Sequence, residues 1–158
     1  MQAKKREDAL AVLLRDHEQA RSLYEAFETA GGDDRYFIAS RILRTVELHG
    51  MIETELFYPV LAARLSAAAP QEAAALLAEA VRDHQDLSKR IAQVRDVLSH
   101  DEEFQLEIER LMAEVCRHFE QEEQTIFSLA RKLLSGAELM QVADDVRRMK
   151  EEDPRRAA

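Results

Sequence analysis

Apolar residues recur every three or four positions through most of the chain, which is the period of amphipathic α-helices. The pattern predicts four long helices and a short fifth one. The expected ranges are about 7–29, 33–65, 70–98, 99–133 and 136–151. Because short connections favour antiparallel neighbours, we expect an all-α fold, an up-down-up-down four-helix bundle with a short fifth C-terminal helix.

Local signals mark the helix borders. Gly31 and Gly32 end the first helix, and Asp33 or Asp34 is expected to cap the second. Pro59 should kink the second helix or end it early, because proline removes a backbone donor and crowds the preceding turn. Two Ser-x-x-Glu spacings predict capping boxes at the starts of the fourth and fifth helices. These are Ser99 with Glu102 and Ser135 with Glu138.

The length of the chain predicts a single domain over residues 1–158, enough to bury a core without disulfides. The bundle is expected at about 7–134, the appended helix at about 136–151 and a mobile tail at 152–158. Charged residues make up 34% of the chain, with only 4 Gly, 3 Pro and no Trp. This balance is typical of long helices with few turns.

Charge and cysteine usage narrow the partners and the compartment. The net charge is -9, and Lys and Arg are interspersed with acids, so no nucleic-acid partner is expected. No window approaches the roughly 20 apolar residues of a membrane span, so no membrane partner is expected either. The single Cys116 cannot form an internal disulfide, and the N-terminus lacks an apolar signal region. We therefore expect a cytoplasmic protein, whose oligomeric state the sequence leaves open.

Each of the four long predicted helices carries one histidine in its apolar stripe. These are His17, His49, His84 and His118, whereas His100 falls in a predicted turn. Counted from the turns, at 1.5 Å per residue, the four lie roughly 21 to 27 Å along their helices. Since these values agree within about one helical turn, we expect the four imidazoles to share one layer.

Two of these histidines begin an HxxxE pair, His49 with Glu53 and His118 with Glu122. Residues four apart lie on one helix face, so each pair presents an imidazole and a carboxylate inward. The second and fourth helices run parallel, which suits two carboxylates that bridge a pair of ions. Bound metal would remove the cost of burying these groups. Nitrogen and oxygen ligands without thiolate favour iron, manganese or zinc.

A polar layer of His–Glu hydrogen bonds without metal is the structural alternative, but six polar residues at one depth in four helices favour metal. Neighbouring candidates are interpreted as structural. Cys116 lies about 200° from His118 and faces away from the cluster. Tyr24 is interpreted as core packing, with a supporting role beside the ligands as the alternative, and Glu55 and Glu123 as solvated.

Two short motifs are repeated in the two halves of the chain. Residues 14–17 (LRDH) are matched by residues 81–84 (VRDH) at an offset of 67, and the two HxxxE pairs are offset by 69. This spacing predicts a helix pair repeated with pseudo-twofold symmetry, in which two histidine helices face two His-plus-Glu helices.

The joint pattern H…HxxxE…H…HxxxE, from Asp16 to about Phe127, resembles the hemerythrin-like (HHE cation-binding) family. Residues 49–59 (HGMIETELFYP) are similar to its second-helix motif, in which the His and Glu ligands precede an aromatic residue and a proline. The resemblance implies a non-haem di-iron centre, two iron ions with an oxo or hydroxo bridge. The terminal ligands would be His17, His49, His84 and His118, and the bridging carboxylates Glu53 and Glu122.

One family feature is missing. Oxygen-carrying members have a fifth histidine one turn from the third-helix ligand, where this chain has Ala80 and Ser88. The missing ligand leaves a position for water, peroxide or a nearby carboxylate, which disfavours reversible oxygen carriage. The expected protein therefore binds or responds to dioxygen, peroxide or nitric oxide, for storage, sensing or detoxification, and peroxidase-like activity stays open. The alternative is an iron- or oxygen-responsive regulatory module with a protein partner and without turnover.

Overall fold

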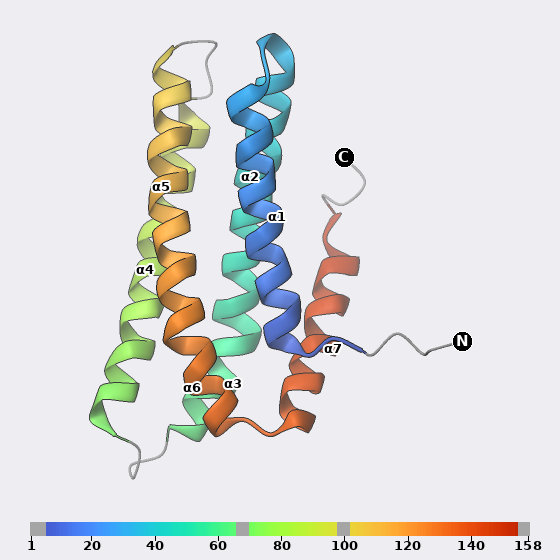
Figure 1. The fold of residues 1–158 in the computed structure, drawn as a ribbon, viewed down its shortest axis with the longest axis vertical. Helices are drawn as coiled ribbons and strands as arrows, with labels where there is room; N and C mark the ends of the chain where they lie inside the picture. The colour runs from blue at the N-terminus through green and yellow to red at the C-terminus, as the bar shows by residue number, and fades with distance from the viewer. Residues whose placement is uncertain (1–5, 66–69, 98–101, 155–158) are drawn as a thin grey trace.

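The computed structural model describes residues 6–65, 70–97 and 102–154, and these ranges are almost entirely helical (Figure 1). Four long helical segments lie side by side. They are α1 (Ala9–Thr29), α2 (Gly32–Ile52) with its continuation η1 (Glu53–Phe57) and α3 (Tyr58–Arg64), α4 (Gln71–Asp96), and α5 (Glu102–Gln124) with its continuation α6 (Ile126–Leu133). A further helix, α7 (Gly136–Glu152), packs against α1 and η1 outside the bundle. The all-α prediction is confirmed.

The start of α2 differs from the prediction that Asp33 or Asp34 caps it. Gly31 is the cap residue, and it makes no side-chain capping hydrogen bond. Gly32 has a positive φ of 52°, a conformation that glycine adopts without steric cost, and the helix begins there. Both aspartates therefore lie inside the first turn, where their carboxylates favourably face the N-terminal end of the helix dipole.

The predicted capping box at the start of α7 is confirmed. The Ser135 side chain accepts from the Glu138 amide at 3.2 Å, and the Glu138 carboxylate accepts from the Ser135 amide at 2.9 Å. The helix ends at Glu152, one residue past its expected end. The second predicted capping box, which begins at Ser99, and the turn with His100 lie outside the described residues, as do residues 155–158 of the predicted tail.

Two of the four long segments are interrupted. As predicted from Pro59, regular α-helix ends early in the second one: the Tyr58 amide donates to the carbonyl of Glu53, five residues back, which makes η1 a turn of π-helix. The predicted fourth helix was expected to run on to Leu133, but it breaks at Thr125. The Thr125 hydroxyl donates to the carbonyl of Gln121 at 2.6 Å, and such threonine contacts bend helices.

The core consists of two apolar clusters with a polar layer between them. One cluster joins the first half of α1 to η1, α3, α6 and α7, and includes Leu13, Phe57 and Phe127. The other joins the second half of α1 to α2, α4 and α5, and includes Phe27 and Phe119. The buried polar residues of the described ranges are Asp16, His17, His49, Glu53, His84, His118 and Glu122. No helix in these ranges is long and apolar enough to cross a membrane.

Candidate metal centre

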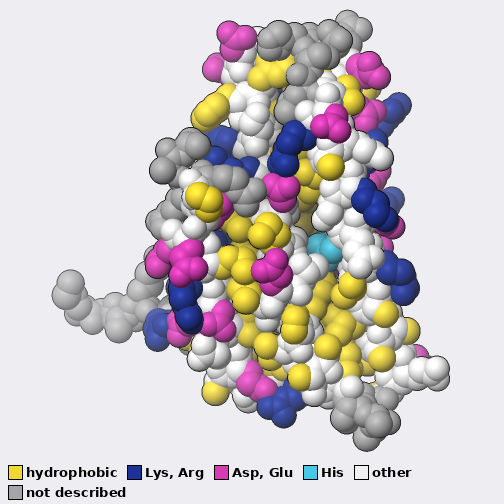
Figure 2. Space-filling model, turned by 180° about the vertical axis from the view of Figure 1, so that it is seen from behind, with side chains coloured by type: hydrophobic (Ala, Val, Ile, Leu, Met, Phe, Trp, Pro, Cys, Tyr) yellow, Lys and Arg dark blue, Asp and Glu magenta, His cyan; other side chains and the backbone are white. Residues whose placement is uncertain are grey.

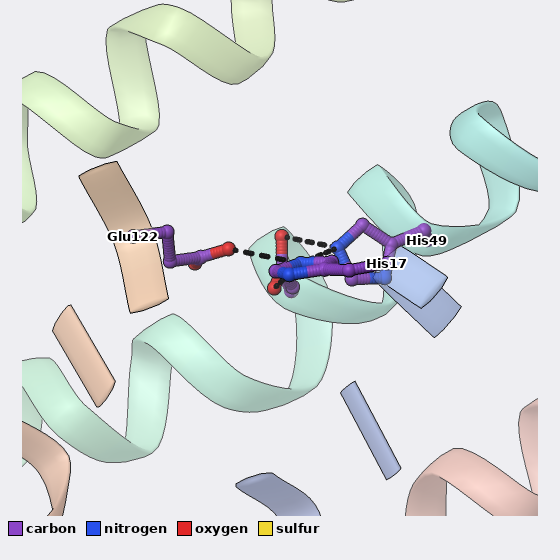
Figure 3. Close-up of side chains that lie close together, drawn as sticks. His17, His49 and Glu122 are labelled. Atoms are coloured by element: carbon purple, nitrogen blue, oxygen red, sulfur yellow. Dashed lines mark hydrogen bonds and ion pairs between the residues drawn. The ribbon is translucent and has the colours of Figure 1, made fainter. Parts of the chain in front are cut away.

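The structure brings the six predicted ligand residues together in the polar layer, and each is at most 6% exposed. They come from all four long segments of the bundle. His17 lies on α1, His49 on α2, Glu53 on η1, His84 on α4, and His118 and Glu122 on α5. Figure 3 shows His17, His49 and Glu122 pointing toward one another from three different segments.

The six side chains form two overlapping groups of four. One group is His17, His49, Glu53 and Glu122, and the other is Glu53, His84, His118 and Glu122. Within each group, one potential ligand atom per residue lies within 4.8 Å of the others. The Nε2 atoms of His17 and His49 are 2.9 Å apart, and those of His84 and His118 are 3.1 Å apart. Each imidazole pair therefore shares the same two carboxylates, a geometry that could hold two ions side by side.

Several carboxylate oxygens in the layer lack a donor. Both carboxylate oxygens of Glu53 and Oε2 of Glu122 are buried without a hydrogen-bond partner among the described residues. Oε2 of Glu53 lies 3.1 Å from Nε2 of His49 and 2.9 Å from Nε2 of His84, but neither contact is a hydrogen bond. Because unpaired buried carboxylate oxygens are costly, cations placed among these atoms would complete the site. The residues present fit a metal pair.

The pKa values of the ligand residues reflect burial and the crowding of ionisable groups. Burial opposes charge on both Glu53 and His49, but their mutual attraction outweighs it, holding the pKa of Glu53 well below its usual range and raising that of His49 to about 10. Burial and the nearby Glu53 carboxylate raise the pKa of Glu122 well above its usual range. Burial and a neighbouring histidine lower the pKa of His17 to about 4 and of His118 to about 3. Shifts in opposite directions are expected where several ionisable groups are buried in contact with one another.

Glu123 contradicts the expectation that it is solvated. Its Oε1 lies 2.7 Å from Nδ1 of His17 and accepts from Arg21 at 3.0 Å, and its side chain is 26% exposed. On α5 it points about 100° away from Glu122, and this direction leads to α1 rather than to solvent. Nothing local in the sequence shows which helix lies there. Glu55, by contrast, is exposed as expected.

The aspartates of the repeated Asp-His pairs lie at the outer nitrogens of two other histidines. Oδ2 of Asp16 is 3.6 Å from Nδ1 of His49, and Oδ2 of Asp83 is 3.9 Å from Nδ1 of His118. Each aspartate thus faces the histidine of the neighbouring helix, not the one that follows it in the chain. The repeat of Asp-His in both halves was the sequence signal for this crossed arrangement.

Tyr58 is a buried site residue that the sequence reasoning missed. Its hydroxyl donates to Oε1 of Glu122 at 2.6 Å and lies 2.9 Å from Nε2 of His84. Burial and the charges of Glu53 and Glu122 raise the pKa of Tyr58 far above its usual range, so the phenol keeps its proton. The phenol oxygen lies beside His84, where neither Ala80 nor Ser88 supplies a second imidazole one turn away.

Replacing Tyr58 with phenylalanine should weaken the centre without emptying it. The buried Glu122 carboxyl would lose its donor, which should cost about 1–3 kcal/mol in the free energy of unfolding of the metal-free protein. Iron affinity should fall by about tenfold, as is typical when a group that orients a ligand is lost. Chemical denaturation and iron titration measure the two effects.

The control variant is Tyr24→Phe. Tyr24 is partly buried against the apolar cluster around Phe27, 6.3 Å between ring centroids, and Cys116 packs against the same cluster. An equal loss of iron affinity in both tyrosine variants would contradict a specific role for the Tyr58 hydroxyl.

Comparison with known proteins agrees with the geometry. The model of the hemerythrin HHE cation binding domain matches residues 8–130. Searches of curated proteins and of solved structures found no match. The matched range contains all six residues of the polar layer that form the two ligand groups, and it ends before α7. The chain belongs to the hemerythrin HHE cation-binding family.

Proposed function

We propose that this protein holds two iron ions between its four long helical segments and binds or responds to dioxygen, peroxide or nitric oxide there. The observation that carries the proposal is the pair of ligand groups that share Glu53 and Glu122. His17 and His49 would complete one metal position, and His84 and His118 the other. Bound iron would supply small-ligand binding and electron transfer. Manganese and zinc accept the same kinds of ligand, so metal analysis has to distinguish the three.

The protein's part in this chemistry is to orient the ligands and to exclude bulk water. The ring of His17 stacks on Phe119 at 3.8 Å between centroids, with an interplanar angle of 11°. Phe127 lies on the same imidazole at 5.6 Å. Contacts of this kind fix ring directions before metal arrives, and the apolar clusters on either side keep the layer dry.

One void beside the histidines of the layer is small, although pockets of about 410 and 320 Å³ also reach His49 and His118. A void of about 10 Å³ between α2 and α4 is lined by Gly50, His84 and His118, among others. Gly50 matters here because a Cβ at this position would lie 3.2 Å from Nδ1 of His84. Figure 2 shows a histidine side chain at the surface of the back face, in a hollow with hydrophobic side chains around it. A void as small as the one beside Gly50 suits diatomic molecules and peroxide better than larger substrates.

The test is rapid mixing of the iron-loaded, reduced protein with nitric oxide, dioxygen or hydrogen peroxide. We expect saturable absorbance changes for at least one of them, and peroxide consumption, where it occurs, at rates above those of free ferrous iron. The metal-free protein supplemented with the same free iron is the control. Identical behaviour of loaded protein and free iron toward all three molecules would overturn the proposal.

A second candidate is an iron-responsive interaction module without turnover. It is favoured by a groove of about 490 Å³ on the outside of the bundle, where α7 meets the second segment. Apolar side chains line much of it, including Leu48, Met51, Leu56 and Met149, and Met51 is 39% exposed. This candidate predicts stability that depends on metal, but no peroxide consumption above that of free iron.

A further inference from the structure

Helix α7 lies beyond the residues that the family model matches, yet it reaches the polar layer. Lys150, near its end, donates to both carboxylate oxygens of Asp16, at 2.6 Å for Oδ2. The Asp16 side chain is only 7% exposed and that of Lys150 is 30% exposed. A buried carboxylate of this kind depends on its cation, because an unpaired buried charge is strongly destabilising.

Asp16 in turn faces the outer nitrogen of His49. Nδ1 of His49 is buried and has no hydrogen-bond partner within the part of the chain that the structure describes, and Oδ2 of Asp16 is its nearest carboxylate oxygen, at 3.6 Å. A histidine that binds metal through one nitrogen generally donates its other N–H to a carboxylate or carbonyl, which fixes the ring. Lys150, Asp16 and His49 therefore form a continuous line from α7 to the candidate metal centre.

The other half of the centre has a different surrounding. Asp83 occupies the equivalent place at His118, but its side chain is 40% exposed. It lines an open pocket of about 320 Å³ with the acidic residues Glu79, Asp86 and Glu114, beside Arg117. The two halves of the bundle thus differ in the surroundings of the aspartates that face His49 and His118. A pocket of about 410 Å³ also reaches Asp16, His49 and Lys150, so the two sides differ in the aspartate itself. Asp16 is buried and paired with Lys150 of α7, whereas no ion pair with a lysine or arginine within the described chain is found for the more exposed Asp83.

We propose that α7 is a positioning element of the metal centre. Lys150 holds Asp16 beside His49, so the metal position completed by His17 and His49 keeps its ion longer than the position completed by His84 and His118. The inference rests on the proposed two-metal function and adds that the two positions release their ions at different rates.

The test is release of ferrous iron from the full-length loaded protein into excess chelator, without oxygen. Wild-type protein should lose its iron in two phases of similar amplitude. Lys150→Met should accelerate the slow phase by about tenfold and leave the fast phase unchanged, in keeping with the usual effect of losing an orienting group. Lys150→Arg should restore slow release. Lys132→Met, at an exposed lysine on α6, is the matched control and should behave as wild type.

A double-mutant cycle separates positioning from simple stabilisation of α7. If Lys150 acts through Asp16, the double variant Asp16→Asn/Lys150→Met should release iron at the rate of Asp16→Asn alone. A Lys150→Met variant that melts earlier in the metal-free state but releases iron at the wild-type rates would overturn the proposal. So would a single release phase in the wild type. A wild-type protein that holds no iron would overturn the proposed function as well.

Discussion

Replacing Glu53 with glutamine is expected to empty both metal positions, from about two irons per chain to below about 0.2. Glu53 belongs to both ligand groups, its oxygens lack hydrogen-bond partners among the described residues, and it is 0% exposed. A neutral amide keeps the shape of the side chain but not the charge that lets a carboxylate bridge two cations. The measurement is elemental analysis of protein purified from iron-supplemented cells.

The control for this substitution is Glu55→Gln, two residues along the same turn. Glu55 is exposed, so Glu55→Gln should leave the iron content unchanged. Circular dichroism of both variants verifies that the helices form. If Glu53→Gln retained wild-type iron, or if Glu55→Gln lost as much, the assignment of Glu53 as a shared ligand would be wrong.

Removing the metal is expected to lower the melting temperature by about 10 °C. A ligand present at a thousand times its dissociation constant adds about 4 kcal/mol to the free energy of unfolding, and in a chain of this size each kcal/mol corresponds to about 2–4 °C. The physical source is the polar layer between the two apolar clusters, in which both oxygens of Glu53 and Oε2 of Glu122 are buried without partners in the described chain. Scanning calorimetry of iron-loaded and chelator-treated protein measures the shift.

The matched control for the melting experiment is the Glu53→Gln protein, which should melt at one temperature with or without iron. Equal melting temperatures for loaded and chelated wild-type protein would contradict the role of metal in satisfying the layer. Such a result would instead favour a layer stabilised by protons and internal contacts.

The helices and the depth of the six polar residues could be predicted because both follow from counting along one helix at a time. An apolar period places a side chain inward, and a rise per residue places it along the axis. The contact between His17 and Glu122 could be predicted from this information alone, because all six ligand residues lie on core stripes. The interruption of the second helix could likewise be predicted from Pro59, because proline lacks a backbone donor.

The contacts at the edges of the layer could not be predicted in this way. Glu123 and Lys150 lie off the core stripes, and their partners depend on which helix is the neighbour and how it is rotated. Tyr58 follows the π turn, whose extra residue rotates the following side chains relative to an ideal helix. The break at Thr125 arises from a side-chain hydroxyl that competes for a helix carbonyl, which the apolar period does not record.

Anomalous diffraction at the iron edge, from crystals of iron-loaded protein, tests most directly whether two metal ions lie between Glu53 and Glu122. We predict two anomalous peaks about 3.5–4 Å apart, the spacing usual for paired metals in proteins, both within bonding distance of the two glutamates. One peak should also contact His17 and His49, and the other His84 and His118. A single peak, or peaks away from these carboxylates, would contradict the account.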